Sequence, residues 1–246
     1  PAVGLGYGSR IVPLQVALPR FIATVRAELS RLEGLDDEPH RILYHNVFSA
    51  YAYVGFQLAS GARPLRDGQF ALALGAPHRE RVRIADKQSP RYAEFRTLQR
   101  SPYLTGLRQE LRKARQGARS LPSFDAVAYE KLGRPLLFFL RWDGVPTHVS
   151  PGEVRRVLEL FPEIGAAYPF PLNVGRHLLE TALSEAGADR GAKDYGLGHQ
   201  RRWKEALGRF STADLPWLEC HFAEHAARIL EQFGLELLRF REGDAS

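Results

Sequence analysis

The chain has 246 residues, of which 44% are hydrophobic and 25% are charged. These proportions are typical of a soluble globular protein with a sizeable core, and no apolar run is long enough to span a membrane. The formal net charge of +6 favours a polyanionic partner, nucleic acid or an anionic surface, and the single cysteine, Cys220, excludes an internal disulfide. We expect a cytoplasmic protein associated with the bacterial nucleoid. Because the sequence has no Met even at position 1, we also expect a processed chain or a fragment.

The first third of the chain predicts an arm, two helices and a small sheet. Residues 1–12 are rich in glycine and are expected to form a flexible arm. Apolar residues recur at helical spacing over 13–35, and a second helix is predicted over 38–60, where Gly61 stops it. The short segments "QFALAL", "ERVRIAD" and "EFRTLQR" then predict an antiparallel sheet with Lys87 at a hairpin turn.

The rest of the chain is predicted to be mostly helical. The basic stretch "TGLRQELRKARQGAR" is expected to be a helix, and "RPLLFFLRW" a buried apolar segment. The helix "SPGEVRRVLELF" begins with Ser150 as N-cap, Pro151 at the first helical position and Glu153 three residues after the cap. Another helix, "NVGRHLLETALSEAG", stops at Gly187. The last helix, "LPWLECHFAEHAARILEQFG", stops at Gly234 within a C-terminal helical segment of about 216–241.

These elements predict one α+β domain over 13–246 that is mainly α-helical, with a small antiparallel sheet near its N-terminal third. Four of its segments carry polar residues in a suggestive order: "LASGARPLRD", "RIADKQSPRYAEFRTL", "PLNVGRHLLETAL" and "GLGHQ". This order and spacing resemble the catalytic domain of the tyrosine recombinases, the phage-integrase family of DNA breaking-and-rejoining enzymes. The resemblance covers about residues 13–230. It implies the recombinase fold, double-stranded DNA as substrate, and a dimer to tetramer on DNA with the C-terminal helix as the candidate for exchange between protomers.

The residue types fit metal-free transfer of a phosphodiester. Arg63 and Arg176 can each offer a planar, always-charged fork to phosphate oxygens, where they stabilise the charge that develops in the transition state. Lys87 can protonate the leaving 5′ oxygen, and His199 can hydrogen-bond the phosphate or help to accept a proton. We expect neither a metal nor a cofactor. In the family, a Tyr about ten residues after the His attacks and forms a 3′-phosphotyrosyl intermediate.

The chain departs from the family pattern at several positions. Asn173 stands where the family often has His or Lys, and it can donate a hydrogen bond but cannot shuttle a proton. Arg66, with Asp67 beside it, stands where the family usually has an acidic residue. The segment "LGRFST" puts Phe210 at the nucleophile position, and all tyrosines precede His199. The domain is therefore expected to be stalled before cleavage, either as an engineered trap or as a natural relative that binds without cutting.

Other polar clusters admit more ordinary interpretations. His221 and His225 lie one turn apart beside Cys220, a spacing that can bind zinc, but we interpret them as a solvated or interface face. The basic run that ends at Arg119 is either a solvated helix face or a phosphate contact. The residues predicted to contact DNA are Arg63, Lys87, Arg108, Arg112, Lys113, Arg115, Arg176, Arg201 and Arg202. The alternatives to a recombinase are a non-catalytic DNA-binding protein of the same fold and a helical protein-interaction domain.

Overall fold

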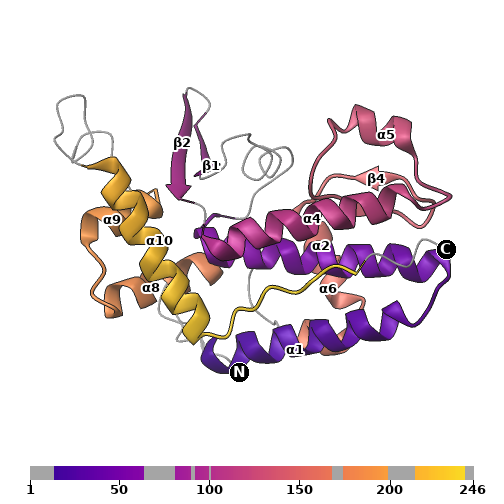
Figure 1. Cartoon of the computed structure of the whole chain (residues 1–246), viewed down its shortest axis with the longest axis horizontal. Helices are drawn as coiled ribbons and strands as arrows, with labels where there is room; N and C mark the ends of the chain where they lie inside the picture. Colours follow the sequence, from indigo (N-terminus) through magenta and orange to yellow (C-terminus); the bar gives the residue numbers. More distant parts are fainter. Residues whose placement is uncertain are drawn as a thin grey trace.

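The computed structural model describes residues 14–63, 81–89, 92–99, 101–167, 174–198 and 214–241. This part of the chain is mainly helical and carries two small antiparallel hairpins (Figure 1), which confirms the predicted mainly α-helical class with a small sheet. The predicted arm over 1–12 and the segment "QFALAL" lie outside the described residues. None of the described helices is long and apolar enough to cross a membrane. The helices are α1 (Leu14–Glu33), α2 (Glu38–Ser60), α4 (Pro102–Arg119), α5 (Ala126–Lys131), α6 (Pro151–Glu159), α7 (Pro162–Ala167), α8 (Val174–Glu185), α9 (Arg190–Gly196) and α10 (Leu215–Gln232).

Helix α2 forms the centre of the core, because α1, α4, α6, α8 and α10 all pack against it. Every side chain from Tyr44 to Ala62 is buried, as expected for a helix that is apolar on all sides. The helix begins where the Asp37 side chain accepts a hydrogen bond from the His40 amide (3.0 Å). It ends at Gly61, as predicted, so the turn after α2 is fixed to the most buried element of the molecule.

The first hairpin pairs β1 (Arg81–Ser89) with β2 (Tyr92–Gln99), which confirms the two strands predicted there. Ile84 and Leu98 are buried and attach the hairpin to the core. Lys87, predicted at the turn itself, lies instead within β1 opposite Glu94. Within the described residues, the pairing continues to Ser89 opposite Tyr92.

A second hairpin, which the sequence did not predict, joins β3 (Phe139–Leu140) and β4 (Pro146–Thr147). It lies in the predicted apolar segment, whose residues 135–140 are all buried. Asn46 of α2 binds the main chain of Leu140 on both sides, with its amide nitrogen donating to the carbonyl and its oxygen accepting from the amide, each at 2.8 Å. This side chain therefore supplies the hydrogen bonds that another strand would have made.

His45, next to Asn46, gives the core a pH-dependent element. Its Nε2 lies 3.1 Å from the carbonyl oxygen of Phe138. Burial lowers the pKa of His45 from 6.5 to about 4, against the opposing effect of the carbonyls of Phe138 and Ala114. The unfolded chain therefore takes up the proton at higher pH than the folded protein does. The stabilising effect of the neutral ring is complete above pH 6.5 and is lost as the pH falls towards 4.

We expect the free energy of unfolding to fall by about 2 kcal/mol between pH 7 and pH 5 because of His45. Urea denaturation at the two pH values measures this change, and His45→Gln should remove most of it. His148→Gln, which replaces an exposed histidine before α6, is the matched control and should keep the wild-type pH dependence. Equal pH dependence in wild type and His45→Gln would show that other groups cause the loss.

The prediction of a C-terminal helical segment over about 216–241 is wrong for its last part. Helix α10 ends at Gln232, where the Leu235 amide closes the last turn by donating to the Leu230 carbonyl (2.8 Å). Residues 235–241, here called the C-terminal strap, then run without helix along α1, α2 and α4 (Figure 1). Phe240 packs edge-on against Tyr44 and Phe48, and its amide donates to Glu110 (2.8 Å). Burial of the Phe240 ring against the core therefore stabilises the chain more than continuation of the helix would.

Helix α10 itself packs on its own chain, against α8, α9, α2 and β2. Its buried face includes Leu218, Phe222, Ala226 and Ile229. In an exchanged dimer the same face of α10 would pack against α8, α9, α2 and β2 of the neighbouring copy. Exchange of α10 between protomers therefore stays a prediction.

Candidate active site

Arg176 joins three parts of the chain that are far apart in sequence. It lies in the first turn of α8, as predicted, and its side chain is buried, with only 5% of its surface exposed. One terminal nitrogen, Nη1, donates to the carbonyl of Gly61 at the end of α2 (2.8 Å), and Nη2 donates to the carbonyl of Leu197 just after α9. The first, third and fourth of the predicted motif segments therefore meet at this one guanidinium.

The turn that carries Arg63 has little freedom to move. Gly61 has a left-handed backbone (φ 58°), and a Cβ at this position would lie 2.6 Å from the side chain of Leu197. The Ser60 hydroxyl donates to the Phe56 carbonyl (2.6 Å) and accepts from the Ala62 amide (3.2 Å). Arg63 follows this turn and is exposed. A rigid turn therefore presents a cation to solvent beside the buried Arg176.

The end of α9 is held against α10 by close packing and a buried hydrogen bond. A Cβ on Gly196 would lie 2.0 Å from the ring of Phe222, so only glycine fits there. The Tyr195 hydroxyl donates to the Glu219 carboxylate of α10 (2.9 Å), and both side chains are buried. The "GLG" part of the fourth motif segment, together with Tyr195 before it, is thus fixed in place just before His199.

The second motif segment, the β1–β2 hairpin, borders the same region, because β2 packs against α9 and α10. Lys87 belongs to this hairpin, on the strand paired with β2. Of the six residues predicted for catalysis, the structure brings Arg176 to the turn that carries Arg63, and it places Lys87 on β1, whose partner β2 packs against α9 and α10. Asn173, His199 and Phe210 lie outside the described residues, as do Arg66, Asp67, Arg201 and Arg202.

Chemically, the described part of this region offers a pair of cations, Arg63 on the surface and the buried Arg176 below it. Two hydrogen bonds to carbonyls hold the Arg176 guanidinium. Those two bonds also fix its orientation, which a phosphate-binding cation needs for strong stabilisation of a transition state. The sequence did not identify the main-chain carbonyls of Gly61 and Leu197 as the partners of this arginine. Glu219, the buried partner of Tyr195, was also missed, and only its place on the apolar face of α10 could have indicated it.

None of the tyrosines with described side chains is a plausible replacement nucleophile. The Tyr195 hydroxyl donates a hydrogen bond to Glu219. Tyr103 is only partly exposed, and its hydroxyl lies 3.2 Å from the Tyr51 hydroxyl. Burial raises the pKa of Tyr51 to about 12 and raises the pKa of Tyr129, which disfavours the phenolate. Among the tyrosines with described side chains, the buried ones are Tyr44, Tyr51, Tyr53, Tyr129 and Tyr195.

The histidines of α10 take part in helix packing. The Nε2 of His221 accepts a hydrogen bond from the Asp189 amide at the start of α9 (3.2 Å), and the ring stacks on Trp217 with centroids 4.8 Å apart. His225 is its next neighbour, with ring centroids 4.5 Å apart. Within the described ranges, no group of three or more His, Cys, Asp or Glu side chains could hold a metal ion. The side of α10 that carries His221 and His225 thus contributes to the contact between α9 and α10.

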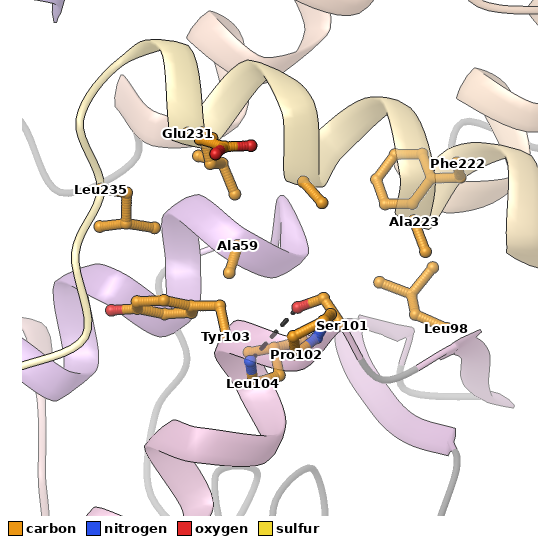
Figure 2. Close-up of a pocket in the computed structure, with 12 residues that line it drawn as sticks. Ala59, Leu98, Ser101, Pro102, Tyr103, Leu104, Phe222, Ala223, Glu231 and Leu235 are labelled. Carbon is orange, nitrogen blue, oxygen red and sulfur yellow. Dashed lines mark hydrogen bonds between the residues drawn. The ribbon is translucent and has the colours of Figure 1, made fainter.

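A cavity of about 220 Å³ lies between α10, the end of α2 and the start of α4 (Figure 2). Its walls are mostly apolar and include Leu98, Tyr103 and Phe222. The Ser101 hydroxyl in its wall is used as a helix cap, since it accepts from the Leu104 amide (3.2 Å; Figure 2). This lining includes the Glu231 carboxylate and no arginine or lysine, so it does not favour a phosphate, and the cationic region around Arg176 remains the candidate site.

Comparisons with protein-family models, with curated proteins and with solved structures found no match to this chain.

Proposed function

We propose that the chain is the catalytic domain of a site-specific DNA recombinase of the tyrosine type. It would bind double-stranded DNA and act through metal-free cleavage and rejoining, with Phe210 stalling it before cleavage. One observation supports this proposal above the others. Arg176 ties the Gly61–Arg63 turn to the end of α9 just before His199, so the residues of three separate motif segments lie around one buried cation.

In this proposal the roles follow from charge and position. Arg63 and Arg176 hold the non-bridging oxygens of the scissile phosphate, and His199 and Asn173 add hydrogen bonds to it. Lys87 delivers a proton to the leaving 5′ oxygen. The rigid turn at Gly61 and the hydrogen bonds of Arg176 keep the two arginines in place before DNA binds, which is the arrangement that favours transition-state stabilisation.

A non-catalytic DNA-binding protein of the same fold is the second candidate. The environment of the tyrosines supports this candidate. The tyrosines with described side chains are buried or hydrogen-bonded within the protein, so none of them is placed to attack DNA. Such a protein would keep the cationic site as a phosphate clamp and would never form a covalent intermediate. Both candidates predict DNA binding, and only the first predicts that a restored tyrosine would react.

We expect the chain to bind duplex DNA with log K falling linearly with log salt concentration, because phosphate contacts release counterions. Arg63→Ala should weaken binding to all sequences alike and reduce the salt slope by about 1. Fluorescence anisotropy with labelled duplexes of several sequences measures both quantities. Arg134→Ala, which removes an exposed arginine already paired with Glu130, is the matched control and should leave the slope unchanged. Binding that does not depend on salt, or an Arg63→Ala protein that binds like wild type, would count against the phosphate clamp.

A further inference from the structure

Helix α4 carries a row of arginines along one side. Arg108, Arg112, Arg115 and Arg119 follow one another at intervals of four, three and four residues. With about 100° of rotation per residue, their side chains leave the helix within about 60° of each other, and the row is about 16 Å long. Arg112 and Arg119 are exposed, whereas Arg108 and Arg115 are half-buried along the border of the buried face. We call these four residues the arginine row.

Lys113, the other basic residue of α4, does not belong to the arginine row. Lys113 leaves the helix on another side and pairs with the buried carboxylate of Glu110 (2.9 Å). Glu110 is the only acidic residue of α4, and its second oxygen accepts the amide of Phe240 from the C-terminal strap. Lys113 and Glu110 therefore serve the core, and the helix offers the arginine row no negative charge of its own.

The arginines of the row are placed close to one another in spite of their like charges. Burial lowers the pKa of Arg108, and the charge of Arg112 lowers it further. Arg115 and Arg119 both lie near the Tyr129 hydroxyl of α5, where their charges oppose the rise in its pKa that burial causes. In the described part of the chain, no carboxylate forms an ion pair with Arg112, Arg115 or Arg119. Repulsion along the row is relieved most directly by an external polyanion.

The position of α4 suggests which polyanion. The helix begins next to the end of β2, near the candidate active site, and runs away from it towards α5 (Figure 1). About 16 Å of helix matches the axial rise of several phosphates on one strand of a duplex. Arginine forks bind phosphate oxygens in pairs, which a flexible lysine ammonium does not do.

We infer that the arginine row is a track for the phosphate backbone of double-stranded DNA beside the reaction site, and that Lys113 is not part of it. The inference rests on the proposed function only in taking duplex DNA as the partner. The track reads no bases, because its contacts are to phosphates, and so it positions the duplex without selecting its sequence.

The test compares two double variants that remove the same charge from the protein. Arg112→Gln with Arg119→Gln changes the two exposed members of the row. The control, Arg155→Gln with Arg156→Gln, changes α6, where these arginines pair with Glu159 and Glu153. The full chain is titrated with a labelled duplex of random sequence over a salt series, and circular dichroism verifies that both variants are folded.

The row variant should bind about 10-fold more weakly at 0.1 M salt, and its salt slope should be smaller by about 2. The control and Lys113→Gln should keep the wild-type slope. Equal losses of affinity in both double variants would overturn the inference, because they would show that binding depends on the total positive charge of the protein. An unchanged salt slope in the row variant would also overturn it. Competition by poly-glutamate as effective as that by duplex DNA would assign the row to acidic proteins instead. Failure of Phe210→Tyr to react covalently would contradict the recombinase proposal and leave this result unaffected.

Discussion

Phe210→Tyr should turn an inert protein into one that becomes covalently attached to DNA. The substitution adds only the phenolic oxygen at the position where the resembling family has its nucleophile, so the cost in packing is small. If the cations around Arg176 are arranged as proposed, this oxygen is the one component that is missing. The measurement is a denaturing gel with a suicide duplex that carries the cognate site. A protein–DNA band should appear with Phe210→Tyr and not with wild type.

The controls separate the nucleophile from the cations. Tyr195→Phe in the Phe210→Tyr background removes the described tyrosine that is nearest to position 210 in the sequence. It should keep the covalent band, because Tyr195 is buried against Glu219. Adding Arg63→Ala or Lys87→Ala should remove most of the band, since catalysis depends on charge stabilisation and on proton delivery. A folded Phe210→Tyr protein that binds its site and never forms the band would favour the non-catalytic relative. The substitutions at Asn173 and Arg66 would then be the sites to restore next.

Arg176→Ala should cost the protein on the order of 3 kcal/mol of stability in addition to its effect on DNA. Two buried carbonyls, those of Gly61 and Leu197, would lose their donor, and a cavity would replace the guanidinium. Urea denaturation followed by circular dichroism measures the loss. Arg63→Ala is the matched control: it removes the other arginine of the motif from an exposed position and should change stability by well under about 1 kcal/mol.

The conservative variant Arg176→Lys tests whether charge or geometry matters. A lysine keeps the charge, but its single ammonium cannot span both carbonyls with the same geometry, so we expect an intermediate stability. Arg176→Ala that is as stable as wild type would show that the two hydrogen bonds do not hold α2, α8 and α9 together. The proposed arrangement of the site would then lose its main support.

The sequence predicted those features that depend on neighbouring residues. Helix α6 begins as expected, with the Ser150 hydroxyl accepting from the Glu153 amide (3.1 Å), because a cap involves residues three apart. The end of α2 at Gly61 was predictable for the same reason. Only half of the capping box formed, since Glu153 pairs with Arg156 (2.7 Å). Lys87 was placed two residues too close to the turn, because strand length depends on the partner strand.

Contacts between distant residues could not be predicted in this way. The role of Arg176 as a donor to Gly61 and Leu197 needs three helices to be in place, and nothing in the local pattern indicates it. The segment after α10 has an apolar pattern that suits a helix, yet Phe240 is drawn to Tyr44 and Phe48 of α2. The burial of Glu110 also could not be predicted, because only the fold brings its carboxylate to the Phe240 amide.

The C-terminal strap has a consequence for how the chain is made. It joins the last described residues to the first helix, through Arg26 with Glu236 and through Arg241 with Glu33, a pair 208 residues apart in sequence. A ribosome needs about 10–40 s to add that many residues, and domains begin to fold as they emerge. For most of this interval Tyr44 and Phe48 are already synthesised while Phe240, which covers them, is not. The nascent protein therefore exposes an aromatic patch until Phe240 has been made, and this is the stage at which chaperone binding or aggregation would determine its yield.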